Sequence, residues 1–495
     1  MTGIGLRRLL KDEAVSAPDI QLSGLSADSG WLAPGWAFAA CSGSRQHGLS
    51  FVDEALRHKP AVVLWESVAD MDPAAALRSC AEAGVPALAV SGLRYRLGQL
   101  AAQVWGQPSV NGIAVHGVTG TDGKTSVSQF LAQALDPVGG CGLIGTLGHG
   151  RPGACQPLAH TTPDAARLQA LLAGFRHDGL AHVAMEVSSH ALDQRRVDAI
   201  RFHSAILTNL GHDHLDYHGD IAAYAAAKRR LFKMPDLALA ILNRDDGFSL
   251  DLREALAADV RVVDYGWERP ACDAASLWCD AYDVHERGCS IELATTAGKL
   301  ALELPLLGRF NVWNVMAVAA LLQGLDWSGD AIRDALQRLQ PIPGRMEPFR
   351  KAGEPLVVVD YAHTPGALEA ALSSLRAHAQ RQLICVFGCG GERDRGKRAR
   401  MGAIAARLAD RVVVTDDNPR NEPPQRIVDD ILVGLRDAPV RIIRDRRTAI
   451  ADALTMADPA DIILLAGKGH EDYQIDASGR RAYSDRSTVM ELLGM

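Results

Sequence analysis

Short apolar runs that end in polar residues recur through the middle of the chain. Between residues 112 and 245 the runs are IAVHGVTG, HVAMEVSS, SAILTNL and LALAILNRDD, and segments with helical periodicity separate them. An apolar run that ends in Gly, Ser, Asn or Asp is typical of a buried strand entering a loop. Strands that alternate with helices in this way predict βα repetition around a parallel sheet.

The same alternation restarts after residue 356. The runs PLVVVDYAH, LICVFGCGG, RVVVTDDNP and DIILLAGKGH each end in a polar loop, which predicts a second, doubly wound parallel sheet with ligands at the carboxyl ends of its strands. Three prolines in LQPIPGRMEP, residues 339–348, indicate a linker. Strands are expected near WAFAA and AVVLWE in the first block, whose topology stays open. We predict an α/β protein with three domains, at residues 1–110, 111–340 and 341–495.

Length and composition limit the class of protein. With roughly 150 residues per domain, 495 residues suggest about three domains, and the 47% apolar and 22% charged residues are ordinary globular usage. A net charge of -7 gives no sign of nucleic-acid binding. Nine cysteines without a CxxC pair favour reduced thiols and a cytoplasmic location. The segment MTGIGLRRLLKDEAV lacks the apolar core of a signal peptide, and no membrane span is predicted.

The segment IAVHGVTGTDGKTS, residues 113–126, is an apolar strand, a glycine-rich turn and the start of a helix. Glycines let backbone N–H groups surround phosphate oxygens, Lys124 can reach the terminal phosphates, and Thr125 offers a hydroxyl to magnesium. The usual spacing G-x4-G-K-[ST] would place a glycine at Val118, so the match is not strict. The alternatives are a glycine-rich turn that arises by chance and a Rossmann turn in FGCGGERDRG, which fails at Arg393.

Candidate metal ligands follow the two next strands. Glu186, in MEVSSH, is a hard oxygen ligand suited to magnesium. The segment LGHDHLDYHGD carries His212, His214 and His218, for which we weigh a closed zinc site, a solvated polar loop and part of an ATP–magnesium site. By its chemistry alone Lys228, in YAAAKRRLF, is most simply an exposed helical lysine. Asp, Asn and Pro in VVVTDDNPRNEPP, residues 412–424, are equally typical of a solvated turn.

Ten motifs in order resemble the Mur ligase family from one end of the chain to the other. They are GTDGKT, TTPDA, MEVSSHALDQRRV, TNLGHDHLDYHGD, AAAKRRLF, PGRMEP, DYAHTP, FGCGGERDRGKR, DDNPR and GKGHEDYQ. The resemblance implies a uridine-nucleotide domain, a central P-loop ATPase with a parallel sheet and a C-terminal Rossmann-like domain that binds an amino acid. It also implies an ATP-dependent ligase that adds meso-2,6-diaminopimelate to UDP-N-acetylmuramoyl-L-alanyl-D-glutamate through an acyl phosphate.

The resemblance assigns roles residue by residue. Around ATP it places Gly117, Val118, Thr119, Gly120, Thr121, Asp122, Gly123, Lys124, Thr125, Ser126, Asn243, Asp246 and Arg345. Near Mg²⁺ it places Thr125, Glu186, His214 and a carbamylated Lys228, and it makes Lys124, Lys228, His214 and Glu186 catalytic. The muramoyl-dipeptide is assigned to Ser29, Thr161, Thr162, Ser188, Gln194 and Arg196. Diaminopimelate is assigned to Arg393, Asp417, Asn418, Pro419, Arg420, Gly467 and Glu471.

The chain departs from the usual family pattern at a few positions. Asp28-Ser29-Gly30 and Gln46-His47-Gly48 stand where DSR and DGH are common, and Asp122 and His160 each stand where asparagine is common. The expected protein is a monomer that acts on small molecules in the cytoplasm, in peptidoglycan precursor synthesis, without nucleic-acid or membrane partners. Two alternatives remain: a folylpolyglutamate synthetase-like ligase, and a nucleotide-binding module without catalysis.

Overall fold

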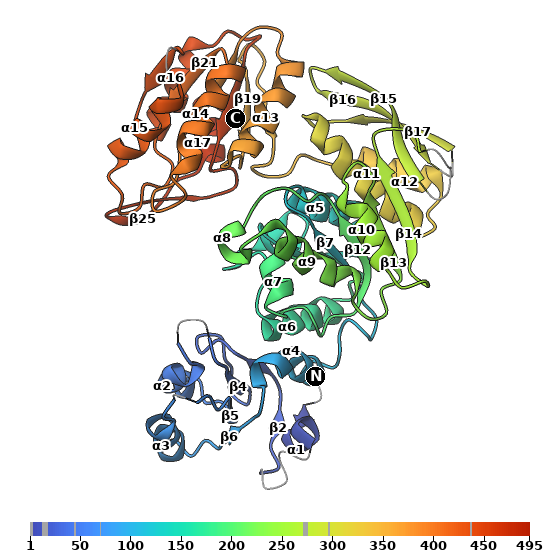
Figure 1. Ribbon diagram of the computed structural model, residues 1–495, viewed down its shortest axis with the longest axis vertical. Coiled ribbons are helices and arrows are strands. Elements are labelled where there is room, and N and C mark those ends of the chain that lie inside the picture. Colours follow the sequence, from blue (N-terminus) through green and yellow to red (C-terminus); the bar gives the residue numbers. More distant parts are fainter. Residues whose placement is uncertain are drawn as a thin grey trace. The chain divides into compact units, whose positions relative to one another are not determined.

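The computed structural model describes residues 3–11, 18–43, 46–69, 71–270, 276–295, 298–435 and 438–495. The chain forms two compact units, one of Met1–Tyr265 with Ala320–Asp326 and one of Gly266–Ala319 with Trp327–Met495 (Figure 1). The expected domain boundaries at residues 110 and 340 stay predictions. Asp12 and Glu13, which argued against a signal peptide, and Cys272 lie outside the described residues.

The first unit contains the predicted central parallel sheet. Its strands are β7 (Ala114–Thr119), β8 (Cys141–Gly145), β9 (Gly148–Arg151), β10 (Ala154–Gln156), β11 (His182–Glu186), β12 (Phe202–Leu207), β13 (Leu239–Asn243) and β14 (Arg261–Gly266), in the order β10-β9-β8-β11-β7-β12-β13-β14. The strands from β8 to β14 pair in parallel and β9 and β10 are antiparallel additions at the edge. The helices between them are α5 (Lys124–Leu135), α6 (Ala165–His177), α7 (Ser189–Asp193), α8 (Leu215–His218), α9 (Ile221–Phe232) and α10 (Phe248–Ala255). The prediction of βα repetition is confirmed.

The first block of the chain has a smaller parallel sheet, which answers the question that the sequence left open. Its strands β3 (Leu25–Ser26), β4 (Ala37–Ala40), β5 (Val62–Trp65) and β6 (Ala87–Ala89) lie in sequence order, and β1 (Ile4–Gly5) pairs with β2 (Gln21–Leu22). The helices are α1 (Leu6–Leu10), α2 (Val52–Arg57), α3 (Ala74–Glu82) and α4 (Leu93–Val104). Leu97 and Leu100 of α4 share one apolar core with Ala166 and Ala173 of α6. This block therefore packs directly on the central one.

The second unit contains the second predicted parallel sheet. Its strands are β18 (Glu347–Phe349), β19 (Leu356–Asp360), β20 (Leu383–Phe387), β21 (Arg411–Val414), β22 (Val440–Ile442) and β23 (Ile462–Ala466), in the order β18-β19-β23-β20-β21-β22, with only β18 antiparallel. Alternate strand residues enter two separate cores, Leu464 one and Ile463 the other. One core is covered by α13 (Pro365–His378), α14 (Gly396–Leu408) and α15 (Pro424–Leu435), the other by α16 (Arg446–Met456) and α17 (Asp485–Leu493).

Several elements were not predicted from the sequence. Antiparallel strands β15 (Ser276–His285), β16 (Gly288–Thr295) and β17 (Gly298–Leu304) precede α11 (Arg309–Gly324) and α12 (Gly329–Gln337), and β24 (Tyr473–Asp476) pairs with β25 (Gly479–Ala482). The proline-rich segment 339–348 packs into the second unit, where Ile342 and Met346 are buried. All eight described cysteines are free thiols. In the described part of the chain, no helix has the length and apolarity that a membrane crossing needs.

Candidate active site

The glycine-rich turn lies between β7 and α5, at the carboxyl end of the central strand β7. Gly120 has a φ of 150°, and a Cβ there would lie 1.8 Å from Thr208 Oγ1, so only glycine fits this close approach. Thr208 Oγ1 also donates to Asp122 O at 2.6 Å. The turn is thus held against the end of β12, and α5 begins directly after it. A glycine-rich turn followed by a helix N-terminus is an arrangement that can bind phosphate.

Two lysines share one carbonyl oxygen of this turn. Lys124 Nζ donates to Gly120 O at 2.8 Å and to Thr121 O at 2.7 Å, and Lys228 Nζ donates to the same Gly120 O at 2.7 Å. Lys228 is buried, and it forms no ion pair among the described residues. Burial, and then the nearby Lys124 cation, lower the pKa of the Lys228 ammonium well below its ordinary value. The prediction of an exposed helical lysine from chemistry alone is wrong, because α9 turns this residue inward.

Glu186, at the end of β11, is a buried carboxylate beside α5. Thr125 Oγ1 donates to Glu186 Oε2 at 2.9 Å, and Thr146 donates to the same carboxylate through its N–H at 2.7 Å and its hydroxyl at 3.0 Å. Glu186 is 1% exposed, so its carboxylate is stabilised by these protein donors and not by water. The structure therefore brings the predicted pair Thr125 and Glu186 together. Thr146 was missed, since nothing in its local sequence distinguishes it.

The histidine-rich segment after β12 is a largely exposed turn. His214 has a φ of 54° and begins α8, its ring is 4.9 Å from that of His190, and it is 6.2 Å from Tyr224. Lys228 Nζ lies 4.3 Å from the same Tyr224 ring, so His214 and Lys228 both border this tyrosine. His218 Nε2 is 3.0 Å from Ser189 Oγ, and His212 is exposed. No group of three or more His, Cys, Asp or Glu side chains that could hold a metal occurs in the described ranges.

Asn243 and Asp246 follow β13 and organise the neighbouring loop. Asn243 Nδ2 donates to Thr208 O at 2.6 Å, and Asp246 Oδ2 accepts from Leu210 N at 2.7 Å. Both side chains therefore fix the backbone at 208–210, directly beside the glycine-rich turn. They lie next to the predicted nucleotide site and shape it through the protein backbone.

The residues expected to contact the muramoyl-dipeptide form one connected network, apart from Ser29. Thr162 Oγ1 donates to Glu186 O at 2.9 Å and accepts from Ser188 N at 3.1 Å. Arg196 donates to Thr162 O at 2.6 Å and to Gln194 Oε1 at 2.6 Å. Thr161 Oγ1 lies 3.1 Å from Thr146 Oγ1, which joins this network to the carboxylate of Glu186. Ser29 lies elsewhere in the unit, after β3, and donates to Glu54 Oε2 at 2.6 Å.

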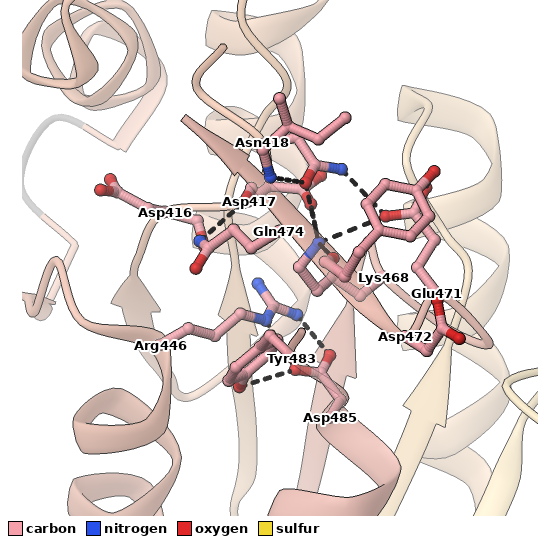
Figure 2. A network of polar contacts seen from close by, with 12 residues as sticks. Asp416, Asp417, Asn418, Arg446, Lys468, Glu471, Asp472, Gln474, Tyr483 and Asp485 are labelled. Atoms are coloured by element: carbon pink, nitrogen blue, oxygen red, sulfur yellow. Dashed lines mark hydrogen bonds and ion pairs between the residues drawn. The ribbon is translucent and has the colours of Figure 1, made fainter. Parts of the chain in front are cut away.

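In the second unit, the segment VVVTDDNPRNEPP is more than a solvated turn. Asp417 and Asn418 are buried, 7% and 5% exposed, whereas Asp416 faces away and accepts both Nε and Nη2 of Arg444 at 2.7 and 2.9 Å (Figure 2). Asn418 Nδ2 donates to Glu471 Oε2 at 2.9 Å. A Cβ at Gly467, whose φ is 115°, would lie 3.4 Å from Asp417 Oδ2. Loops after β21 and β23 thus bring together four of the residues expected to bind diaminopimelate.

The two expected arginines border the same glycine. A Cβ at Gly390 would lie 3.0 Å from Arg420 Nη1 and 3.7 Å from Arg393 Cγ. Arg420 has a φ of 55°, donates from Nη1 to Gly391 O at 2.8 Å and is half-buried; Pro419 before it is buried. Arg345 is also in the second unit, with its guanidinium 4.7 Å from the Tyr361 ring. Arg393 and Arg420 therefore lie beside the loop after β20, whereas Arg345 lies beside Tyr361, after β19.

The residues of the first unit fit a magnesium ion. Glu186 supplies a carboxylate and Thr125 a hydroxyl 2.9 Å apart, and both are oxygen ligands of the kind Mg²⁺ prefers. Magnesium is commonly held by one or two carboxylates with substrate phosphates and water, and not by a closed protein cage. One buried carboxylate at the N-terminus of a phosphate-binding helix meets that requirement.

Comparisons with known proteins agree with this geometry. The family model described as "Mur ligase middle domain" matches residues 118–322, and that described as "Mur ligase, glutamate ligase domain" matches residues 344–469. UDP-N-acetylmuramoyl-L-alanyl-D-glutamate–2,6-diaminopimelate ligase of Alkalilimnicola ehrlichii is 50% identical and is covered over 98% of its length by 99% of this chain. The relative of the same description from Ectopseudomonas mendocina is 45% identical, with 95% of this chain and 94% of the relative covered.

Two solved structures place the fold. One, described as the same diaminopimelate ligase, has a TM-score of 0.71 and 33% identity and covers 100% of this chain and 99% of its own. Folylpolyglutamate synthase of Mycobacterium tuberculosis has a TM-score of 0.61 and 21% identity and covers 81% of this chain and 95% of its own, which is a likeness of fold alone.

A glycine-rich turn before a helix, with a buried carboxylate on the adjacent strand, defines the class of P-loop nucleotide-binding proteins. The relatives are about half identical to this chain over nearly its whole length, which is enough to assign the family within this class. The chain belongs to the Mur ligase family.

Proposed function

We propose that the chain is an ATP-dependent ligase that joins meso-2,6-diaminopimelate to the D-glutamate of UDP-N-acetylmuramoyl-L-alanyl-D-glutamate. The observation that carries the proposal is the 50% identity to a relative of that description over 99% of this chain, together with the second unit's cluster of buried Asp417 and Asn418 with Glu471. The step belongs to peptidoglycan precursor synthesis. The nucleotide substrates and the free thiols suit the cytoplasm, and we expect a monomer.

ATP is assigned to the turn from Gly117 to Ser126. Backbone N–H groups of this turn and the N-terminus of α5 would receive the phosphates, and Lys124 would turn from the carbonyls of Gly120 and Thr121 to the transferring phosphate. Asn243 and Asp246 keep the adjacent loop in place. We expect Arg345 to join the nucleotide, as the family resemblance implies.

Thr125, Glu186, His214 and Lys228 would hold magnesium. When bound, magnesium neutralises phosphate charge during the transfer. Lys228 becomes suitable only after carbamylation, in which its neutral amine attacks carbon dioxide, loses a proton and becomes a carboxylate-bearing carbamate. Its burial without an ion pair among the described residues supports this assignment, because burial favours the neutral amine.

The chemistry proceeds in two transfers. A carboxylate oxygen of the D-glutamate side chain attacks the γ-phosphorus of ATP, the bond to ADP breaks, and an acyl phosphate forms. The amine of diaminopimelate then attacks the acyl carbon, phosphate leaves and the amine loses a proton. Thr161, Thr162, Ser188, Gln194 and Arg196 would hold the muramoyl-dipeptide, and their network reaches Glu186 through Thr146 and Thr162.

The amino-acid pocket is assigned by its charge pattern. Arg420 suits a two-point pair with the distal carboxylate of diaminopimelate, and Arg393 stands beside it. Lysine has the same two amines but lacks the distal carboxylate, so its distal ammonium would face Arg420 without the anion that pairs with this arginine. A pocket built to pair a charged group rejects an analogue that lacks it by about 10⁴-fold.

The deciding experiment measures ADP release with ATP, magnesium and the muramoyl-dipeptide, adding meso-diaminopimelate, lysine or glutamate separately. We expect turnover with meso-diaminopimelate alone. Equal turnover with lysine would contradict the specificity. Turnover that needs a folate acceptor and glutamate would indicate a folylpolyglutamate synthetase-like ligase, and ADP release indifferent to any amino acid would indicate a nucleotide switch.

A further inference from the structure

The loop after β23 encloses a lysine that the sequence analysis did not single out. Lys468 is 0% exposed, and its Nζ lies 2.8 Å from Tyr473 O, 3.1 Å from Asn418 Oδ1, 3.2 Å from Glu471 Oε2 and 3.3 Å from Asp417 Oδ1 (Figure 2). An ammonium group has three N–H donors, and four oxygens surround this one. Lys468 therefore has no donor left for a substrate and can act only through its neighbours.

These neighbours come from two separate loops. Asp417 and Asn418 follow β21, whereas Glu471 and Tyr473 follow β23, and β20 lies between those two strands in the sheet. Asn418 Oδ1 accepts from Lys468 Nζ at 3.1 Å and from Ile475 N at 3.0 Å, so Asn418 Nδ2 faces Glu471 Oε2, 2.9 Å away. Lys468 Nζ is ion-paired with both carboxylates, 3.3 Å from Asp417 Oδ1 and 3.2 Å from Glu471 Oε2, and so joins the two loops directly.

The cluster also has a definite charge balance. Two carboxylates, the buried Asp417 and the partly buried Glu471, are ion-paired with a single cation, so the three groups together carry one negative charge. Arg393 and Arg420 lie around Gly390, and Arg420 Nη1 is 3.5 Å from Asn418 O. Carboxylates and guanidinium groups that lie close together match an amino acid that carries an ammonium and a carboxylate.

We propose that Lys468 is a positioning residue of the amino-acid pocket, which holds Asp417, Asn418 and Glu471 in the arrangement that receives the ammonium-bearing end of the incoming amino acid. This inference rests on the proposed function and adds a residue that touches no substrate. The loss of a buried charged hydrogen-bond centre weakens binding about 30- to 100-fold.

The test compares Lys468→Met with the unmodified full-length chain. We expect the KM for meso-diaminopimelate to rise about 30- to 100-fold, while the KM values for ATP and the muramoyl-dipeptide stay within about twofold and kcat at saturating diaminopimelate falls less than about tenfold. An unchanged KM for diaminopimelate, or an equal rise for all three substrates, would overturn the proposal.

A matched control separates positioning from stability. Arg446 and Asp485 form the other buried ion pair in Figure 2, both 0% exposed and joined by two bonds of 2.7 Å. Asp485→Asn keeps the shape of this pair and removes its charge. We expect a lower thermal midpoint with a KM for diaminopimelate within about twofold. A KM rise equal to that of Lys468→Met would reduce Lys468 to a structural residue.

A second variant covers the case in which Lys468→Met does not fold. Lys468→Arg keeps the buried cation, but a planar guanidinium cannot direct its donors at oxygens that converge on one point. We expect a folded protein whose KM for diaminopimelate is raised about tenfold, and a value within about twofold would overturn the proposal. If the unmodified chain shows no turnover that depends on diaminopimelate, the proposed function itself fails. Failure of the Lys468 inference is different, because the unmodified chain then turns over diaminopimelate and only the variants give unexpected KM values.

Discussion

Lys228 in the first unit and Lys468 in the second are both buried lysines, 1% and 0% exposed, yet their surroundings are opposite. Lys228 donates to one backbone carbonyl and lies near a second lysine, whereas Lys468 is enclosed by two carboxylates, an amide oxygen and a carbonyl. A buried ammonium without an acid is favoured as a neutral amine, which can react. One that is surrounded by acids is a fixed charge that holds its neighbours in place.

The largest effect is expected at the glycine-rich turn of the first unit. Lys124→Ala removes the cation aimed at the transferring phosphate, and turnover should fall by about 10³-fold or more. ADP release at saturating ATP measures it, with the exposed Lys299→Ala as control. Near-normal ADP release by Lys124→Ala would show that the lysines around Gly120 only stabilise the turn.

Lys228→Ala tests the reactive side of the comparison directly. We expect about 10²-fold lower turnover, partly restored by added small carboxylates that replace the carbamate. Lys228→Arg keeps a cation that carbon dioxide does not modify, so it should be as inactive as the alanine variant. Full activity of either variant would show that the enzyme does not need a carbamate at Lys228.

Arg420→Ala tests the positive side of the pocket that Lys468 organises. Loss of a paired charge should raise the KM for meso-diaminopimelate about 50-fold, because the distal carboxylate loses its partner, and should leave the KM for ATP almost unchanged. Steady-state kinetics with each substrate varied in turn measure the KM for meso-diaminopimelate and the KM for ATP separately. A change in the KM for ATP of the same size would mean that the loop acts on the whole unit.

The smallest effect is expected on the pH dependence of stability, and it comes from the buried His116 of the first unit. His116, with Nδ1 2.8 Å from Ser204 Oγ and Nε2 3.1 Å from His182 Nδ1, has a pKa well below its ordinary value of 6.5 through burial, then His182 and His203. In the unfolded chain His116 binds a proton below pH 6.5, whereas in the folded chain it stays neutral. Its contribution to the free energy of unfolding is therefore fully present above pH 6.5 and is lost as the pH falls below that value.

The measurement is the thermal midpoint of unfolding between pH 7 and pH 5. His116→Gln should make the decrease smaller by about 3 °C, since one buried base no longer titrates. The exposed His177→Gln should leave the decrease as it is in the unmodified chain. An identical pH dependence in all three proteins would mean that His116 does not control this loss.

Much of this arrangement was predictable from the sequence. The apolar runs that end in polar residues predicted both parallel sheets, because the strand and its exit loop are contiguous. The glycine-rich turn between strand and helix was predicted for the same reason: successive residues supply the backbone donors of the proposed phosphate site, and Thr125 follows Lys124 directly. The antiparallel strands β15 to β17 were missed, since they carry no motif beyond the alternation of apolar and polar residues.

Only the tertiary structure decided which polar residues meet. Asp416 and Asp417 are equivalent in the sequence, yet one pairs with Arg444 at the surface and the other lies buried beside Lys468. Thr146 reaches Glu186 across 40 positions, and Lys228 reaches Gly120 across 108. Local conformation follows from neighbouring residues, but such contacts depend on strand order and on which way each loop turns, and these are set by the packing of the whole sheet.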